Sequence, residues 1–166
     1  MDSGQGITHT VPIFEGYAIP HAITPIPICG MDLTKYMLQL MQLKDPSIGN
    51  AALDFISAED AKIRHCEVAI DFDAQLKEAR EKTADNDKYT LPGGQKISIK
   101  EERLMCPELL FQPRENNADS KGIHNYTFDS IMKCENDIKK ELFRNIVMAG
   151  GSTMFKNMQK RMKKEI

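Results

Sequence analysis

Two short segments of the chain combine glycine with small polar residues: the first could bind a phosphate group, and the second could contact the other end of a nucleotide. The first is the sequence DSGQG at residues 2–6, and the second is GGST at residues 150–153. Backbone amides in a glycine-rich turn can approach a phosphate closely, and the dipole of a following helix favours an anion. Glycine pairs also serve as ordinary hairpin turns and helix caps, so neither segment is specific by itself.

Asp2 and His9 could add chemistry to the first of these turns. A carboxylate beside bound phosphates can hold a water molecule of a hydrated Mg²⁺ ion. His9 follows the turn on a strand-like segment, where it could reach a water molecule near a phosphate. A strand histidine can equally be an ordinary core residue. His21, His65 and His124 show no metal-ligand spacing.

Composition excludes several classes of protein. The 166 residues have a net charge of -2, with 28% charged residues of both signs interspersed, so no basic face predicts direct binding of nucleic acid. No apolar run approaches the roughly 18 residues of a membrane span, and the start lacks the pattern of a signal peptide. The isolated cysteines indicate reduced thiols, not a disulfide framework or a zinc site, and favour cytosol or nucleus: Cys29, Cys66, Cys106 and Cys134.

Strand and turn signals predict the elements around these segments. Residues 8–14 and 17–23 alternate around Glu15-Gly16 and predict a hairpin, which should be buried because it is mostly apolar. A second hairpin is predicted around residues 92–94. The prolines and glycine of residues 24–32 indicate a connection, and we place a boundary near Gly30.

Apolar periodicity predicts the helices. A helix capped by Asp32 should bury one stripe and end by Pro46, and SAED at residues 57–60 should cap a second helix that runs through Cys66 to Ala69. Further helical segments are expected within residues 101–113, after Gly122 and at the carboxyl end. A strand at residues 146–149 should precede the last of these helices. The last helix should place three methionines in the core: Met154, Met158 and Met162.

Four segments, taken in order, resemble actin: DSGQGITHTVPIFEGYAIPHAI, CPELLFQP, GIHNYTFDSIMKC and MAGGSTMF followed by RMKKEI. The resemblance spans residues 2–166 and corresponds to the larger lobe, so we expect the protein to continue upstream. It implies an α/β (α+β), ribonuclease-H-like actin fold with an inserted, mostly helical subdomain. Residues 1–28 and 119–166 would form the subdomain-3-like layer, and residues 29–118 the subdomain-4-like insertion.

The resemblance also implies a site for ATP or ADP with Mg²⁺, and slow ATP hydrolysis in the full-length protein but not in this segment alone. Asp2 would hold the metal through water, and His9 would help to place the attacking water. Phosphate contacts would come from the first turn: Asp2, Ser3, Gly4, Gly6 and Ile7. Ribose and adenine would be enclosed by the remaining residues: Gly30, Lys62, Gly150, Gly151, Ser152, Met154 and Phe155.

The chain departs from the family pattern at several of these places. Gln5 stands where actin has a second aspartate, Ile63 where a nucleotide-contacting glutamate belongs, and Glu59 where an arginine belongs. Pro25 and Pro27 replace an arginine and an aspartate near the route of phosphate exit. A missing carboxylate weakens the outer shell of a hydrated magnesium ion, so these changes indicate a divergent member.

Three functions follow from the resemblance. The first is a cytoplasmic, cytoskeletal actin-like protein that forms or joins actin-type filaments, with actin or actin-like subunits and actin-binding proteins as partners. The alternative is a scaffold subunit of a motor or chromatin complex, nuclear in some cases, that binds nucleotide weakly and polymerises poorly. Residues 115–118 favour it, because polar ENNA replaces the apolar plug of actin. A small-molecule kinase of the same superfold is the third.

Overall fold

The first glycine turn belongs to a small antiparallel sheet in the computed structural model of the protein, which describes residues 1–49, 51–81, 88–113 and 121–166. The strands lie in the order β1 (Asp2–Ser3), β2 (Thr8–Thr10), β5 (Thr24–Ile26). The sequence led us to expect a plain connection at residues 24–32, but its first part is a strand. Pro25 lies in the edge strand β5, opposite His9, and edge strands tolerate a residue that has no N–H.

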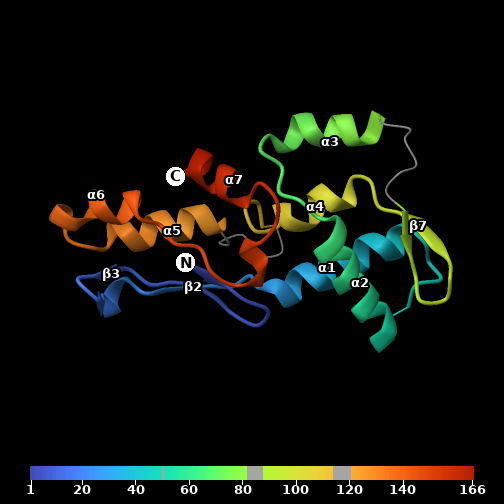
Figure 1. Ribbon diagram of the computed structural model, residues 1–166, viewed down its shortest axis with the longest axis horizontal. Helices are drawn as coiled ribbons and strands as arrows, with labels where there is room; N and C mark the ends of the chain where they lie inside the picture. Colours follow the sequence, from blue (N-terminus) through green and yellow to red (C-terminus); the bar gives the residue numbers. More distant parts are fainter. Residues whose placement is uncertain (50, 82–87, 114–120) are drawn as a thin grey trace.

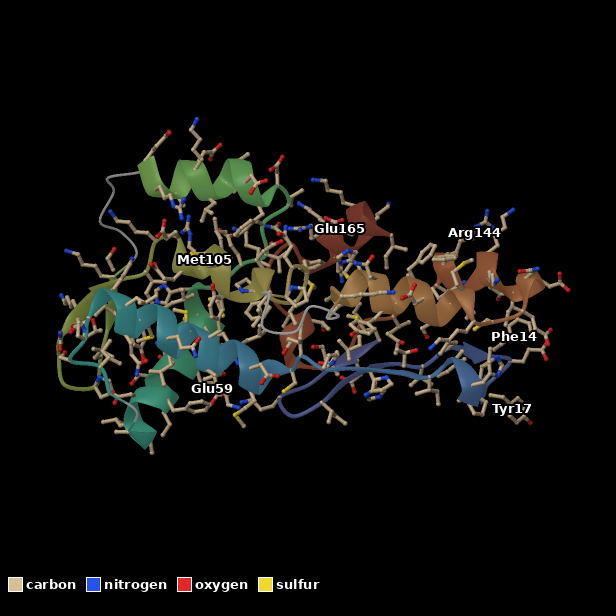
Figure 2. The ribbon with its side chains drawn as sticks, turned by 180° about the vertical axis from the view of Figure 1, so that it is seen from behind. Phe14, Tyr17, Glu59, Met105, Arg144 and Glu165 are labelled. Atoms are coloured by element: carbon tan, nitrogen blue, oxygen red, sulfur yellow. The ribbon has the colours of Figure 1, made fainter. Side chains whose placement is uncertain are left out.

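The hairpin predicted around Glu15-Gly16 is confirmed at its tip, where β3 (Ile13–Phe14) pairs with β4 (Tyr17–Ala18). Both turn residues have positive φ, 50° and 82°, which suits the twist of a two-residue hairpin. The predicted burial is wrong. Ile13 is 56% and Tyr17 is 80% exposed, because the tip projects from one end of the molecule, near the end of α6 (Figure 2).

The sheet end of the elongated molecule also carries two helices, and the opposite end is mostly helical (Figure 1). At the sheet end lie η1 (Pro20–Ala22), α5 (Ile123–Met132) and α6 (Asn136–Arg144). At the other end lie α1 (Gly30–Lys44), α2 (Ala52–His65), α3 (Phe72–Glu81), α4 (Glu102–Glu108) and the second predicted hairpin, β6 (Lys88–Thr90) with β7 (Lys96–Ser98). The fold thus mixes helices with small sheets, as expected for the α/β class. The division into residues 1–28 with 119–166 and residues 29–118 stays a prediction.

Helix α1 is the centre of the core at the helical end. Its predicted apolar stripe is confirmed, since Leu33, Met37, Leu40 and Met41 are all at most 5% exposed. The helix begins at Gly30, two residues before the predicted cap, and the Asp32 carboxylate accepts a hydrogen bond from the Cys29 N–H at 2.9 Å. Asp32 therefore stabilises the first turn from within the helix.

Helix α2 differs from its prediction at both ends. It begins at Ala52 because the Asp54 carboxylate accepts the N–H of Ala51, which caps the helix earlier in the chain. Ser57 lies inside the helix, where its hydroxyl donates to the Leu53 carbonyl at 2.8 Å. The helix ends at His65 and does not continue to Ala69, since residue 67 forms a parallel bridge with residue 156.

The carboxyl-terminal segment confirms only part of its prediction. Met158 and Met162 of α7 (Met158–Glu165) are 1% and 3% exposed and belong to the core. Met154 is 84% exposed and precedes the helix, so its predicted core position is wrong. The φ of 67° at Asn157 separates α7 from the 3₁₀ turn η2 (Gly151–Thr153), which breaks the periodicity assumed from the sequence. The expected strand at residues 146–149 is reduced to one bridge, between Asp2 and Ala149.

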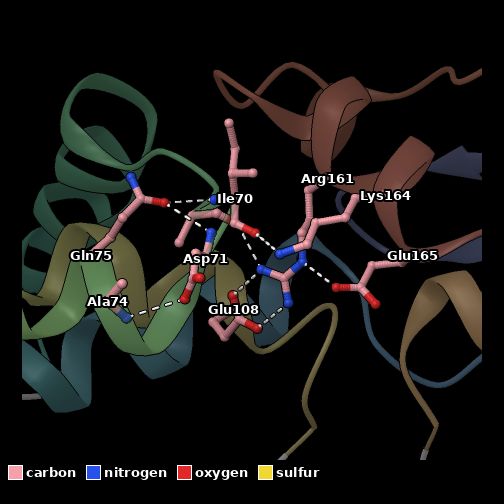
Figure 3. A network of polar contacts seen from close by, with 9 residues as sticks. Ile70, Asp71, Ala74, Gln75, Glu108, Arg161, Lys164 and Glu165 are labelled. Atoms are coloured by element: carbon pink, nitrogen blue, oxygen red, sulfur yellow. Dashed lines mark hydrogen bonds and ion pairs between the residues drawn. The ribbon is translucent and has the colours of Figure 1, made fainter.

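A buried ion pair joins α7 to α4 (Figure 3). The Arg161 guanidinium donates to both Glu108 oxygens, at 3.0 and 2.8 Å, and to the Ala69 carbonyl at 2.6 Å. It also donates to Glu165 at 2.7 Å, and this hydrogen bond lowers the pKa of the Glu165 carboxyl. With Arg161 and Glu108 each 4% exposed, the pair fixes the carboxyl-terminal helix against the helical end.

Candidate functional site

The first glycine turn, residues 4–7, connects β1 to β2 and is held by the start of α1. The Gly4 N–H donates to the Ile7 carbonyl at 2.9 Å. The N–H groups of Gly30 and Met31 donate to the carbonyls of Gly4 and Gln5, at 2.9 and 2.8 Å. The first amides of α1 thus fix the turn, and a contact between Gly30 and a ligand stays a prediction.

The second glycine segment lies directly against β1. The Ser3 N–H donates to the Ala149 carbonyl at 2.9 Å, and the Ala149 N–H donates to the Met1 carbonyl at 3.0 Å. Gly150 has φ 89°, and a Cβ there would lie 2.4 Å from the Ser3 oxygen and 2.5 Å from the nearer Asp2 carboxylate oxygen. Only glycine fits this position. The two segments singled out from opposite ends of the sequence are therefore neighbours.

A cleft of about 780 Å³ opens beside these turns. One wall is the face of α2 and the residues after it, from Glu59 to Glu67, and the other is the segment from Gly151 to Lys156, with Gln5 and Arg103 completing the lining. Five predicted nucleotide-binding residues line it: Lys62, Gly151, Ser152, Met154 and Phe155. Its volume is that of an ordinary small-molecule site.

Lys62 lies in the wall of the cleft but is only 5% exposed. Its ammonium donates to the Gly30 carbonyl at 3.0 Å and to the Thr34 hydroxyl at 2.7 Å. Two of its three N–H donors therefore hold α2 against α1, which leaves one for a ligand.

The remaining predicted residues lie outside the lining of the cleft. Asp2 and His9 are opposite each other in the ladder between β1 and β2 and line a second hollow, of about 400 Å³. Gly6 and Ile7 line a third hollow, of about 410 Å³, in which His9 also takes part. Ser3 is fully buried, with its hydroxyl 3.0 Å from that of Thr8, so its side chain faces the core. The structure brings the two predicted catalytic residues together but separates them from the larger cleft.

Two residues named only as departures from the family pattern meet in the cleft. The Gln5 side-chain amide donates to the Glu59 carboxylate at 2.9 Å, and this contact joins the glycine turn to α2. Elsewhere in the lining, Arg64 pairs with Asp60 at 2.7 Å and Lys156 pairs with Glu67 at 3.1 Å. Sequence reasoning missed Glu59 and Glu67 as lining residues. The available signal was their spacing: Glu59, Ile63 and Glu67 follow one another at intervals of four residues, as residues on one face of a helix do.

The described residues include no group of three or more histidine, cysteine or acidic side chains that could hold a metal ion. A hydrated Mg²⁺ ion needs fewer protein ligands, because it keeps several waters and binds substrate phosphates. The exposed Asp2 carboxylate, beside Gly150, fits such contact through water. Within the same residues, no helix is both long and apolar enough to cross a membrane.

One comparison with known proteins identifies the family of this chain. A model of the Actin family matches residues 1–52 and 54–166. The match therefore includes both glycine segments and every residue of the cleft.

Proposed function

The chain belongs to the actin family, and on that premise we propose that it supplies one side of a site for ATP or ADP with Mg²⁺. We propose further that the protein acts as an actin-like subunit that forms or joins actin-type filaments, in the cytoplasm or also in the nucleus. The observation that carries the nucleotide proposal is the cleft, in which five of the residues implied by the family resemblance gather from distant parts of the sequence.

The cleft has the features that a nucleotide requires. Ile63 and Met154 are 68% and 84% exposed at its walls and offer apolar surface to a base. Gln5 belongs to the lining and is hydrogen-bonded to Glu59, so the glycine turn lies at the edge of the cleft next to the Glu59 end of its α2 wall. Because α1 holds this turn in place, a phosphate bound by its backbone amides would require little reorganisation of the protein, which preserves binding free energy.

Asp2 and His9 are the proposed hydrolytic residues. Asp2 would hold a water molecule of Mg²⁺, and the metal would neutralise charge on the phosphates. His9, its neighbour across the ladder, would orient the attacking water. Asp2 lines a separate hollow, but one of its oxygens lies close to Gly150, the residue before the wall-forming segment, so a ligand that extends past Gly150 would reach it.

Gln5 favours the second candidate function, a scaffold subunit with weak nucleotide binding. Its side-chain amide nitrogen is bonded to Glu59, and its oxygen faces Gly30, where a Cβ would lie 2.7 Å from it. The side chain is therefore engaged within the protein and adds no charge for a hydrated metal ion. Residues 115–118, which favoured the same function, lie outside the described residues.

Sedimentation of the full-length protein with Mg-ATP, alone and with actin, distinguishes the two candidates. Long filaments from the protein alone, visible by electron microscopy, would establish the filament subunit. Pelleting only with actin or within a host complex, with measurable nucleotide binding, would establish the scaffold. Failure to bind any nucleotide would contradict the proposed site. Actin alone serves as the positive control for pelleting.

A further inference from the structure

Glu59 is the carboxylate of the cleft that has no cationic partner within the described part of the chain. The cations Arg64 and Lys156 pair with Asp60 and Glu67. Glu59 instead accepts a hydrogen bond from the neutral amide of Gln5. It is half-buried on α2 and belongs to the lining of the cleft.

A carboxylate of this kind selects neutral donors. An ionised carboxylate offers about four acceptor positions, of which Gln5 occupies one. It repels phosphate, so it does not bind the phosphate part of a ligand. The vicinal hydroxyls of a ribose are neutral donors, and acidic side chains bind them in other nucleotide sites.

The position of Glu59 along the cleft matches that of a sugar. Glu59 is hydrogen-bonded to Gln5 of the glycine turn, whereas Glu67, beyond the end of α2, pairs with Lys156 next to Phe155. Ile63 lies one helical turn, about 6 Å, further along α2 from Glu59, on the side towards Glu67. A nucleotide with its phosphates at the turn and its base between Ile63 and Met154 therefore presents its ribose to Glu59.

We propose that Glu59 determines the selectivity of this cleft for ribonucleotides over deoxyribonucleotides, by accepting hydrogen bonds from the ribose hydroxyls. The inference rests on the proposed nucleotide site and adds the class of ligand that the site prefers. It also assigns a role to the Gln5–Glu59 hydrogen bond, which positions the carboxylate at the boundary between the phosphate and sugar parts of the cleft.

The test compares Mg-ATP with Mg-2′-deoxy-ATP on the full-length protein, by titration calorimetry. The wild-type protein should prefer ATP about tenfold, the magnitude of one hydrogen bond to a charged group. Glu59→Gln, which is isosteric and can still contact Gln5, should lose most of that preference while binding deoxy-ATP equally well or more tightly. Glu67→Gln is the matched control, because it removes a cleft carboxylate that is already paired, and its preference should be unchanged.

The outcomes separate this inference from the function on which it rests. If neither nucleotide binds the wild-type protein, the proposed site is wrong and the inference is overturned with it. If both bind without a preference, or if Glu59→Gln keeps the preference, the site stands and only the role of Glu59 is overturned. Far-ultraviolet circular dichroism and urea unfolding of each variant show that the comparison is made between folded proteins.

Discussion

Replacing Gly150 with alanine should destabilise the protein by far more than the same change at Gly151. Gly150 has φ 89° and ψ 155°, a region of backbone conformation that is essentially restricted to glycine. Its position also leaves no room, because a Cβ would lie 2.4 Å from the Ser3 carbonyl oxygen and 2.5 Å from an Asp2 carboxylate oxygen. The methyl group must push β1 away from residue 149, where the two segments are hydrogen-bonded.

The two effects set the expected magnitude. The backbone strain costs about 1 to 3 kcal/mol, and the displacement of β1, in which Ser3 is buried, adds to it. The expected total loss is about 2 to 4 kcal/mol. Gly151 is the matched control, since a Cβ there meets nothing within 4 Å. Gly151→Ala should change the free energy of unfolding by about 0.5 kcal/mol or less.

Urea denaturation of both variants, followed by circular dichroism, measures these changes. Mg-ATP affinity is measured in parallel, and Gly150→Ala should lower it, because the displaced β1 carries Asp2 and the start of the glycine turn. Equal stability of the two alanine variants would refute the reasoning. It would mean that residues 1–3 and 149–150 are not packed together as the structure describes.

Three further predictions concern other residues. Arg161→Met should lower the free energy of unfolding, measured by urea denaturation, by about 3 to 5 kcal/mol, because it leaves the Glu108 carboxylate buried without a partner. Adding Glu108→Leu should then restore stability. A loss no larger than that of the exposed Lys164→Ala would contradict this cause. Burial lowers the pKa of His124, so the folded state binds a proton at this imidazole less well than the unfolded chain does. The free energy of unfolding of the wild-type protein should therefore fall as the pH is lowered from about 6.5 towards the pKa of the folded state. His124→Phe, which can keep the stacking on Phe111, should reduce this slope between pH 7.5 and 5.5, and an identical slope in both proteins would argue against His124. Gln5→Asp should raise the Mg²⁺ affinity of the nucleotide complex, because it adds a carboxylate next to the proposed phosphate position. Calorimetry showing unchanged or weaker Mg²⁺ binding would contradict the assigned role of residue 5.

The parts of the fold that could be predicted from the sequence are those set by local patterns. The stripe of α1 repeats over two turns of helix and could only be buried as one face. Gly16 and Gly94 mark turns that require positive φ, and both are found in hairpins. The sequence predicts the start of α2 too late, because Ser57 and Asp54 can both cap a helix. Only tertiary contacts select between these two residues.

Pairings between distant segments could not be read from the sequence. The segment of residues 8–14 alternates as a single strand, but its first half joins β1 and β5 and only its end forms the hairpin. Met154 matched the spacing of a core stripe, yet the positive φ at Asn157 turns it out into the cleft. Neither feature leaves a local signal, since each depends on contacts with residues far away in the chain.

The candidate site shows the same division. The glycine segments were identifiable from residue type, and the family resemblance supplied Lys62 and Phe155. The engagement of the Lys62 ammonium by Gly30 and Thr34 and the contact between Gln5 and Glu59 emerged only from the packing of α2 on α1 and on the turn. Side-chain hydrogen bonds of this kind depend on angstrom-level positions, which sequence patterns do not specify.

Photolabelling of the full-length protein with 8-azido-ATP tests the central claim most directly, because the label reports where the base lies. After digestion, mass spectrometry should find the label on residues 59–67 and 151–156, the two walls of the cleft, and excess Mg-ATP should abolish it. ATP-sensitive labelling of the second hollow, at residues 9–13 or 142–149, would contradict the account. So would the absence of any labelling that ATP suppresses.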